Sequence, residues 1–307
     1  MAIPSGSLTD TSAISNLVQT AYDQYVRMAL RSIPVMRALA DVKPVQQAMP
    51  GSSVVFSIYS DLAQATSTLT ESSDVSSIAL GNPNQVTVTL QEYGSAVTTT
   101  KKLNLTSFND VDAALADIIA YNAADSIDAV VAGVLTSGTN IIYGGTATNN
   151  AGITAGGTIS VSDIRAAVTN LRSNKALPRI GELYAAYLHP KQTADLRAET
   201  GTGGFQDLSK YVDRTPFVAG AVGVLEGAFI VETPRVLSAS NGTTTVYKAI
   251  VAGREALAEA QGQDISTVIG PQIDALRRFH TIGWYYFGGW NILRAPAIYQ
   301  IQTATAY

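Results

Sequence analysis

The sequence contains no cysteine, which excludes a disulfide framework and any thiolate metal site. Charge is also scarce, because Asp, Glu, Lys and Arg make up only 14% of the 307 residues, against about 25% in ordinary soluble domains. A surface with so few charges must consist of Ser, Thr, Ala and Gly or be covered by another molecule. The composition therefore favours a protein whose surfaces are largely occupied by copies of itself, and a weakly charged monomer is the alternative.

Basic runs and long apolar runs are missing as well. The net charge is −4 and Lys and Arg form no run longer than two residues, so the chain lacks the electrostatic footprint of a tight nucleic-acid binder. The first ten residues, MAIPSGSLTD, have neither the basic nor the apolar region of a signal peptide. No uninterrupted apolar run approaches ~18 residues, so we expect no transmembrane helix and no membrane partner.

The residue patterns of common catalytic and cofactor sites are absent too. The sequence contains no GxGxxG, GxxxxGK[ST], GxSxG or HExxH, and the glycines of GTGGFQ at 201–206 lack phosphate-loop spacing. The only two histidines, His189 and His280, lie far apart in the chain. We interpret His189 as a helix cap or helix contact and His280 as an ordinary strand residue. The sequence therefore predicts no catalytic, metal-binding or cofactor-binding residue, and no cofactor.

The clearest local pattern is a helix predicted over 110–135. Ser107 and Asp110 have the spacing of a capping box at its start. Five apolar residues fall on one side of the helix, with Val130 in the middle of the stripe: Leu115, Ile119, Ile127, Val130 and Val134. Four aspartates fall on the opposite side: Asp110, Asp117, Asp125 and Asp128. Together with Asp112 they lack the loop spacing of calcium ligands, so we interpret this side as a bare, solvated acidic strip.

Residues 52–95 have a different pattern. Two short runs around Val54–Ile58 and Val86–Leu90 alternate apolar and polar residues, as β-strands do. Between them lies a stretch rich in Ser, Thr and Ala that ends in the turn signal NPN at 82–84. Such a two-stranded excursion has too little apolar surface for a core of its own. We therefore expect it to become ordered on a neighbouring molecule.

The remaining segments give an N-terminal arm and an α/β unit. The arm has a helical stripe over 11–33, and a Gly-, Thr- and Asn-rich stretch at 136–158 marks a domain boundary. Beyond it the chain alternates predicted helices and strands, in the order helix 160–174 opened by a Ser160/Asp163 capping box, strand 183–188, helix 191–199, and strands 228–237 and 245–252.

The end of the chain is heavily aromatic. Residues 277–302 read RRFHTIGWYYFGGWNILRAPAIYQIQ and contain both tryptophans of the protein. We predict two strands, 279–287 and 290–302, joined by a tight turn at Gly288-Gly289. A lone hairpin is marginally stable in water, so this one must pack against an earlier part of the chain.

The order of these parts resembles the major capsid protein of tailed bacteriophages, which has the Hong Kong 97 fold. Four stretches carry the resemblance in sequence order. GSSVVFSIYSDL is similar to the start of the family's extended loop. QVTVTLQEYGSAVTTTKKLNLTSFNDVDAALADIIAYNAADSIDAVV is similar to its return strand and spine helix. LYAAYLHPKQTADLRA, GAFIVETPRVL and VYKAIVAGREALAEA are similar to its axial domain, and LRRFHTIGWYYFGGWNILRAPAIYQIQT to the closing strands of its peripheral domain.

The resemblance implies an α+β protein divided into four parts. These are a partly helical N-terminal arm (1–51), an extended β-hairpin loop (52–95), a peripheral domain with the spine helix 110–135 (96–158 and 265–307), and an axial α/β domain (159–264). The C-terminal hairpin would rejoin the spine helix. The acidic strip would lie on or near the inner surface as a lining that does not adhere to DNA.

The implied function is that of a structural, non-enzymatic shell subunit in the virion, assembled in the host bacterial cytoplasm around double-stranded DNA. Its implied partners are copies of itself in hexamers and pentamers, a scaffolding protein, a portal, decoration proteins, and packaged DNA bound without sequence specificity. Since the first predicted helix begins near residue 11, scaffolding is expected from a separate protein or a longer precursor. Two alternatives stay open: an encapsulin shell, which has the same fold and holds cargo proteins, and an α/β enzyme built on residues 160–264.

Overall fold

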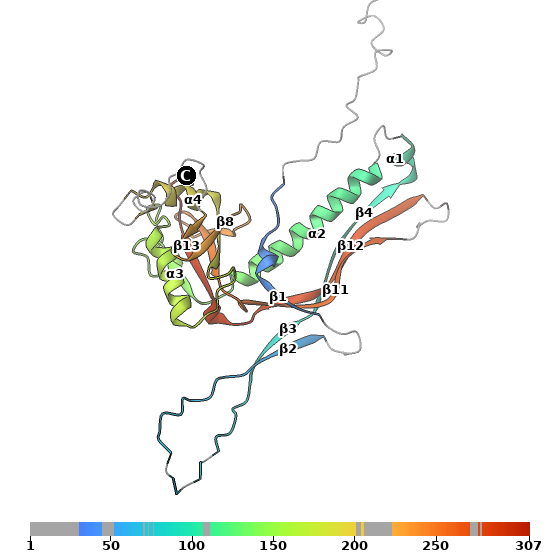
Figure 1. Cartoon of the computed structure of the whole chain (residues 1–307). Coiled ribbons are helices and arrows are strands. Elements are labelled where there is room, and N and C mark those ends of the chain that lie inside the picture. The colour runs from blue at the N-terminus through green and yellow to red at the C-terminus, as the bar shows by residue number, and fades with distance from the viewer. Residues whose placement is uncertain are drawn as a thin grey trace, which may run out of the picture.

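The computed structural model describes residues 31–44, 52–69, 71–72, 74–75, 77–106, 111–200, 204–205, 223–270, 276 and 278–307. A four-stranded sheet and a seven-stranded sheet lie on opposite sides of the molecule, and a two-stranded hairpin projects away from both (Figure 1). The helix expected over 11–33 lies outside the described residues except for 31–33, which are not helical.

The first sheet has four strands from both ends of the chain. In order they are β1 (Ala40–Pro44), β11 (Leu257–Ile269), β12 (Phe279–Ile292) and β4 (Gln91–Thr100). β1 runs parallel to β11, and the other pairs are antiparallel. A short helix that the sequence did not predict, α1 (Lys101–Thr106), follows β4. The expectation that an aromatic C-terminal strand packs with earlier strands is confirmed for β12.

The long helix covers one face of this sheet (Figure 1). It runs as α2 from Val111 to Leu135, which confirms the helix predicted over 110–135. The proposed capping residues Ser107 and Asp110 lie outside the described residues. Its buried side is a stripe of residues at successive i+4 spacing, namely Leu115, Ile119, Ala123, Ile127, Val131 and Leu135. These pack in one core with Ile282, Trp284 and Tyr286 of β12.

The centre of the stripe differs from the prediction by one residue. Val131 is fully buried, whereas Val130 and Val134 are only partly buried and pack at the edge of the core. The difference arises because Ala123 and Ala132 are buried too. When the apolar stripe is predicted from the larger residues alone, these alanines are left out. The predicted buried face is then rotated about the helix axis relative to the observed one.

The same helix meets the length and composition of a membrane span, contrary to our expectation from uninterrupted apolar runs. The segment is Leu115–Leu135, with a mean hydropathy of 1.4. In the fold, however, its apolar side packs on the four-stranded sheet. Asp125 and Asp128, inside the same segment, form ion pairs with Arg235. The hydropathy of α2 is therefore that of a domain-core helix.

The second sheet has seven strands. Six form the path β5 (Ile141–Tyr143), β13 (Ile298–Thr303), β10 (Thr245–Ala252), β6 (Tyr184–Leu188), β8 (Ala228–Glu232) and β7 (Val224–Leu225), and β9 (Ser238–Ser240) pairs with β10. Helices α3 (Val161–Ser173) and α4 (Pro190–Ala198) accompany it. The core of this body includes Ile164, Leu171 and Leu188. The predicted helices and strands of the α/β unit are confirmed, including the contact of the Asp163 carboxylate with the Ser160 backbone N–H. The exception is the strand predicted over 228–237, which ends at Glu232, before the turn that contains Pro234.

The predicted C-terminal hairpin is wrong. β12 is one continuous strand of 14 residues that runs through Gly288 and Gly289 without a turn. A Cβ atom at Gly289 would overlap the carbonyl oxygen of Thr89, and one at Gly288 would overlap the Tyr286 hydroxyl. Gly289 therefore allows the base of the projecting hairpin to cross the sheet at close range, and Gly288 leaves room for the Tyr286 side chain and the Ala260 carbonyl oxygen within the sheet. The sequence correctly indicated that these two positions require glycine. The reason is the close approach of neighbouring atoms, and not a tight turn.

The strand pairing also differs from the expected division of the chain. β13 pairs with β10 and β5, so residues 298–303 lie in the seven-stranded sheet and do not rejoin α2. β11 begins at Leu257, before the expected boundary at 265, and β5 lies in the segment assigned to the peripheral part. The chain changes sheet at a 3-10 turn, Ala295–Ala297, that contains Pro296. Proline cannot donate a ladder hydrogen bond, so it ends the strand that we expected to continue there.

The corrected helix face gives a test by substitution. We expect Val131→Asp to destabilise the protein by several kcal/mol, because an unpaired carboxylate would be placed in the core between α2 and β12. Val130→Asp should cost clearly less, since that side chain lies at the edge where the carboxylate can reach water. The measurement is the midpoint of chemical unfolding for both variants. Equal losses, or a larger loss at Val130, would show that the face is misassigned.

Candidate assembly surfaces

The acidic side of α2 is covered by another part of the chain. We call residues 31–44, which include β1, the strap; its first part crosses this side of the helix and its last part pairs with β11. The Asp128 side chain is 2% exposed. Its Oδ1 accepts hydrogen bonds from the backbone N–H of Met36 at 2.6 Å and of Arg37 at 3.2 Å. Its Oδ2 accepts one from Arg235 Nε at 2.6 Å. Asp128 is therefore a structural residue of the interior.

The predicted bare acidic strip is thus wrong. Asp125 pairs with Arg235, and Asp117 pairs with Arg31 at 2.9 Å. Asp110 lies outside the described residues, and the side chain of Asp112 is not among those described. The helical wheel placed these aspartates correctly opposite the apolar stripe, but it carries no information on which elements pack against that side. The idea of an acidic lining falls with the strip for Asp125 and Asp128.

A second buried carboxylate lies where the strap meets the four-stranded sheet. Glu259 of β11 is fully buried. It accepts hydrogen bonds from Arg37 Nη2 at 2.6 Å and from the Tyr286 hydroxyl at 2.8 Å. Burial raises the pKa of Tyr286, and the Glu259 carboxylate raises it further, so the hydroxyl stays protonated as a donor. The Tyr286 ring also stacks on that of Trp290, with centroids 5.3 Å apart. Neither Arg37 nor Arg235 was singled out from the sequence, where each is one isolated arginine.

The two histidines have structural roles. His189 caps α4, because its Nδ1 accepts a hydrogen bond from the backbone N–H of Lys191 at 3.2 Å, and its ring packs 4.5 Å from that of Tyr247. Burial lowers the pKa of His189, and the nearby Lys191 charge lowers it further. His280 lies half-buried in β12, paired with Thr99 of β4. Within the described ranges no three His, Asp or Glu side chains gather as metal ligands.

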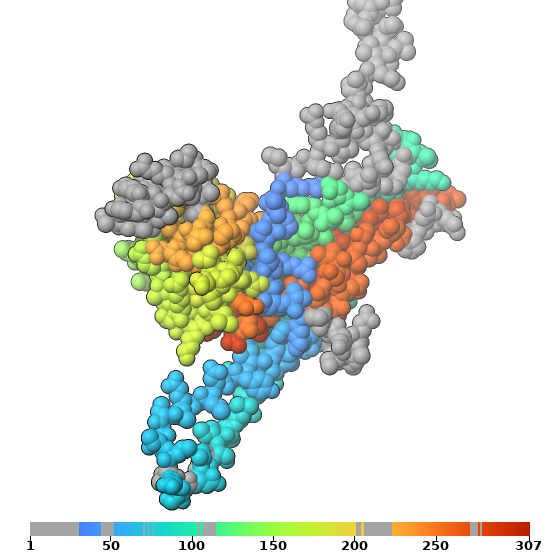
Figure 2. Space-filling view, in the orientation of Figure 1, coloured from blue at the N-terminus to red at the C-terminus, as the bar shows by residue number. Residues whose placement is uncertain are grey.

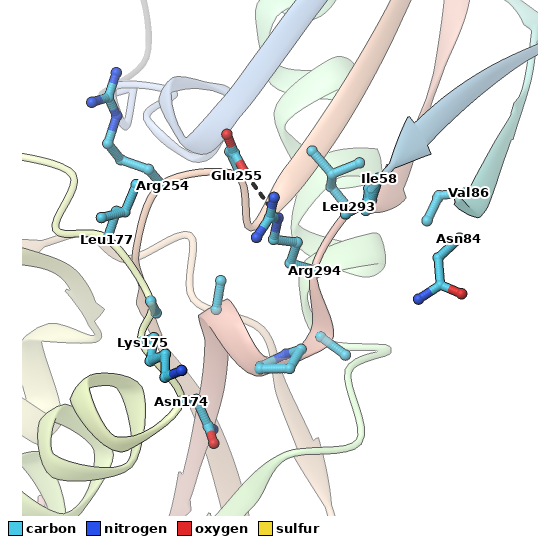
Figure 3. A pocket seen from close by; sticks show the side chains of 14 residues that line it. Ile58, Asn84, Val86, Asn174, Lys175, Leu177, Arg254, Glu255, Leu293 and Arg294 are labelled. Atoms are coloured by element: carbon cyan, nitrogen blue, oxygen red, sulfur yellow. Dashed lines mark ion pairs between the residues drawn. The ribbon is translucent and has the colours of Figure 1, made fainter. Parts of the chain in front are cut away.

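A groove of about 360 Å³ lies at the base of the projecting hairpin (Figure 3). Its walls come from the hairpin base, the turn after α3, the turn before β11 and the 293–297 segment. Lys175 and Arg254 line it together with Arg294, which pairs with Glu255 at 2.8 Å. Lys175 and Glu255 both have φ of 56°, a left-handed conformation that favours glycine. Among the residues that line the groove, no nucleophile lies beside a general base.

The projecting hairpin consists of β2 (Ser53–Ile58) and β3 (Asn84–Thr89), which confirms the two predicted strands. The described residues between them form no strand and extend away from the body (Figures 1 and 2). Six large apolar side chains of this stretch are more than half exposed: Tyr59, Leu62, Leu69, Val75, Ile78 and Leu80. β4 begins at Gln91, so the excursion ends before the expected residue 95. So much apolar surface on a segment without a core is typical of a docking element.

The charge of the hairpin has one sign. Residues 45–100 contain no Lys or Arg, and the stretch between β2 and β3 carries Asp61, Glu71 and Asp74. At the opposite end of the molecule, α1 and the ends of β11 and β12 form what we call the distal end (Figure 1). Lys101 and Lys102 are exposed there. Five apolar side chains near them are exposed as well, namely Leu103, Leu105, Ile269, Leu276 and Phe279. The two ends of the molecule are therefore both apolar and of opposite charge.

Comparison with known proteins identifies the fold and the family of the chain. No curated protein sequence matches the chain. Among solved structures, the chain is similar to the capsid of the cyanophage P-SCSP1u, with a TM-score of 0.73, 18% identity, and 95% of this chain and 94% of that chain covered. It is also similar to the head of Helicobacter pylori bacteriophage KHP40, with a TM-score of 0.73, 13% identity, and coverage of 99% and 100%. A third is the capsid of a native GTA particle, with a TM-score of 0.68, 16% identity, and coverage of 97% and 100%.

These likenesses extend over the whole chain and confirm the Hong Kong 97-like capsid fold, with its mixture of helix and sheet. A family model described as phage capsid protein matches residues 10–294. That range includes the strap, the projecting hairpin, α2 and most of both sheets. The chain belongs to the phage capsid protein family.

Proposed function

We propose that this chain is the major capsid protein of a tailed bacteriophage and assembles, as hexamers and pentamers of itself, into an icosahedral shell around double-stranded DNA. The observation that carries the proposal is the exposed, coreless hairpin of a chain in the phage capsid family. The subunit resides in the virion after assembly in the bacterial cytoplasm. A scaffolding protein, a portal and decoration proteins complete the set of partners that the resemblance implies.

The hairpin provides the physical reason for self-association. Its six exposed apolar side chains have no partner in their own subunit's core clusters, as far as the described residues extend. Burying apolar surface gains roughly 25 cal/mol per Å², so the stretch between β2 and β3 gains most when it lies on another subunit. Because only 14% of the residues are charged, covering the rest of the surface also desolvates fewer charges than covering an ordinary protein surface would.

The distal end is the site that we propose for the hairpin of a second copy. It has the opposite charge, from Lys101 and Lys102, and exposed apolar residues that match those of the hairpin. Complementary charges mainly fix the register and orientation of such a contact, while the apolar residues supply its free energy. A heterologous contact of this kind, between two different surfaces of one chain, gives closed rings when the rotation between neighbours closes, as a hexamer or pentamer requires.

The two alternatives have less support. An encapsulin-type shell is not favoured, because the family match and the similar structures reported above are phage or GTA capsids. An α/β enzyme on residues 160–264 is not supported by the groove or by either histidine, since neither places a general base beside a nucleophile. DNA inside the shell is held by confinement and counterions in this proposal, because the chain has no basic run.

Shell formation and its dependence on the hairpin are testable by negative-stain microscopy. We expect the unaltered protein to give closed particles or regular rings. Replacing residues 60–82 by a short Gly/Ser turn should leave β2 and β3 paired and the subunit folded, with no closed particles. The triple variant Leu62→Ser, Leu69→Ser and Ile78→Ser, which removes exposed apolar side chains of the hairpin, should also give no closed particles. Its control is Val224→Ser, which changes an exposed apolar residue on β7 and should assemble normally. Normal particles without the stretch would refute its role, and a uniform monomer of the unaltered protein would refute the shell.

The proposed contact predicts a charge-reversal result. Lys101→Glu with Lys102→Glu should reduce the yield of assembled particles, because acidic residues would then face the acidic hairpin. Adding Asp61→Lys, Glu71→Lys and Asp74→Lys should restore part of that yield. Lys191→Glu on α4, an exposed lysine far from the distal end in the chain, is the control. If the yield falls and the compensating changes restore none of it, the hairpin and the distal end are not partners.

A further inference from the structure

The strap is held by side chains from both bodies of the protein. Figure 2 shows it in blue between the seven-stranded-sheet body and the body formed by α2 and the four-stranded sheet. From the seven-stranded-sheet body, Arg179 donates to the carbonyl oxygens of Ala38 at 2.8 Å and Ala40 at 3.2 Å. From the other body, the Tyr121 hydroxyl of α2 donates to the carbonyl oxygen of Ser32 at 3.1 Å. The strap therefore makes polar contacts with both bodies at the place where they meet, which we call the joint.

One arginine joins all three parts at once. Arg235, in the loop after β8, donates to Ser32 Oγ of the strap at 2.9 Å. The same guanidinium donates to the Asp128 carboxylate at 2.6 Å and to the Asp125 carboxylate and carbonyl oxygen of α2. Its side chain is 9% exposed. A guanidinium presents its donors in a fixed planar fork, so these contacts restrict the orientation of the β8 loop relative to α2.

The strap in turn compensates two buried carboxylates. Asp128 receives two of its hydrogen bonds from strap amides, and Glu259 receives its ionic partner, Arg37, from the strap. Met36 and Leu39 are also buried in the core beside α2. Removing the strap would leave Glu259 with the Tyr286 hydroxyl alone, according to the contacts described. A buried charge that loses its partner is strongly unfavourable, so partial opening of the joint is disfavoured.

We propose that the strap is a latch between the two bodies. When it is closed, Arg235 and Arg179 hold the seven-stranded-sheet body in one orientation relative to α2. When the strap lifts, Arg179 loses its two carbonyl partners and Arg235 loses Ser32 while keeping its contacts with α2. The two bodies then shift relative to each other, within the limits set by the connections 136–140, 253–256 and 293–297 and by the apolar core that they share. Intermediate states between closed and open are then disfavoured, because the carboxylates of Asp128 and Glu259 require either their full set of hydrogen bonds or contact with water. This inference concerns one subunit and does not depend on shell formation.

The experiment measures the strap and the joint separately in dispersed subunits. Hydrogen exchange over residues 33–40 reports the strap, because the Met36 and Arg37 amides are bonded to Asp128. The distance between spin labels at Ala116→Cys on α2 and Thr169→Cys on α3 reports the joint. Both positions are exposed, and the chain has no other cysteine to label. We expect Arg235→Met to speed exchange of the strap at least tenfold and to broaden the distance distribution.

Controls and a milder variant keep the outcome decisive. Arg165→Met breaks an exposed ion pair with Glu226 on the same body and should change neither readout. Ser32→Ala removes one hydrogen bond from the joint and should speed strap exchange a few-fold even if Arg235→Met does not fold. Fast exchange with an unchanged distance distribution would overturn the coupling. Unchanged exchange in Arg235→Met, or in Ser32→Ala where Arg235→Met does not fold, would overturn the latch itself.

Discussion

The buried contact of Asp128 with Arg235 and the strap is the constraint on which the arrangement of the subunit depends. Asp128 comes from α2, Arg235 from the loop after β8, and the two amides from Met36 and Arg37, so one carboxylate collects three distant parts of the chain. Burying a carboxylate is costly unless its hydrogen bonds are completed. The strap must therefore lie where it does for the two bodies to hold this orientation.

Little of this joint is predictable from the sequence, and the reason is physical. Local periodicity follows from the geometry of one element, which is why α2, the strands of the projecting hairpin and the capping residues of α3 and α4 were predicted correctly. The partners of Asp125 and Asp128 come from residues about a hundred positions away, and no local pattern encodes them. The absence of catalytic and cofactor motifs from the sequence was itself informative, because a structural subunit requires contact surfaces and no such motif.

The errors at the C-terminus have a similar origin. Gly288-Gly289 matched the pattern of a tight turn, but glycine serves equally where another backbone approaches closely, and the sequence does not distinguish the two uses. The return of β13 to the seven-stranded sheet was missed because its alternation fits any half-buried strand. A strand pairs with a sheet edge whose backbone groups are still without partners. Which edge that is depends on the whole fold, so the sequence of the strand alone does not predict it.

The distribution of the few charges separates two tasks. Within the subunit, the buried carboxylates of Glu259 and Asp128 pair with Arg37 and Arg235, and these pairs fix one internal geometry. Outside it, the exposed stretch of the hairpin is acidic and the distal end is basic, and both are otherwise apolar. Apolar burial supplies association energy without direction, whereas a small number of exposed charges supplies register. In the shell that we propose, exposed charge pairs contribute little individually, so each contact between copies would be weak enough to be reversed. Such a shell would gain its stability from the number of contacts, and a misplaced subunit held by fewer of them would be released.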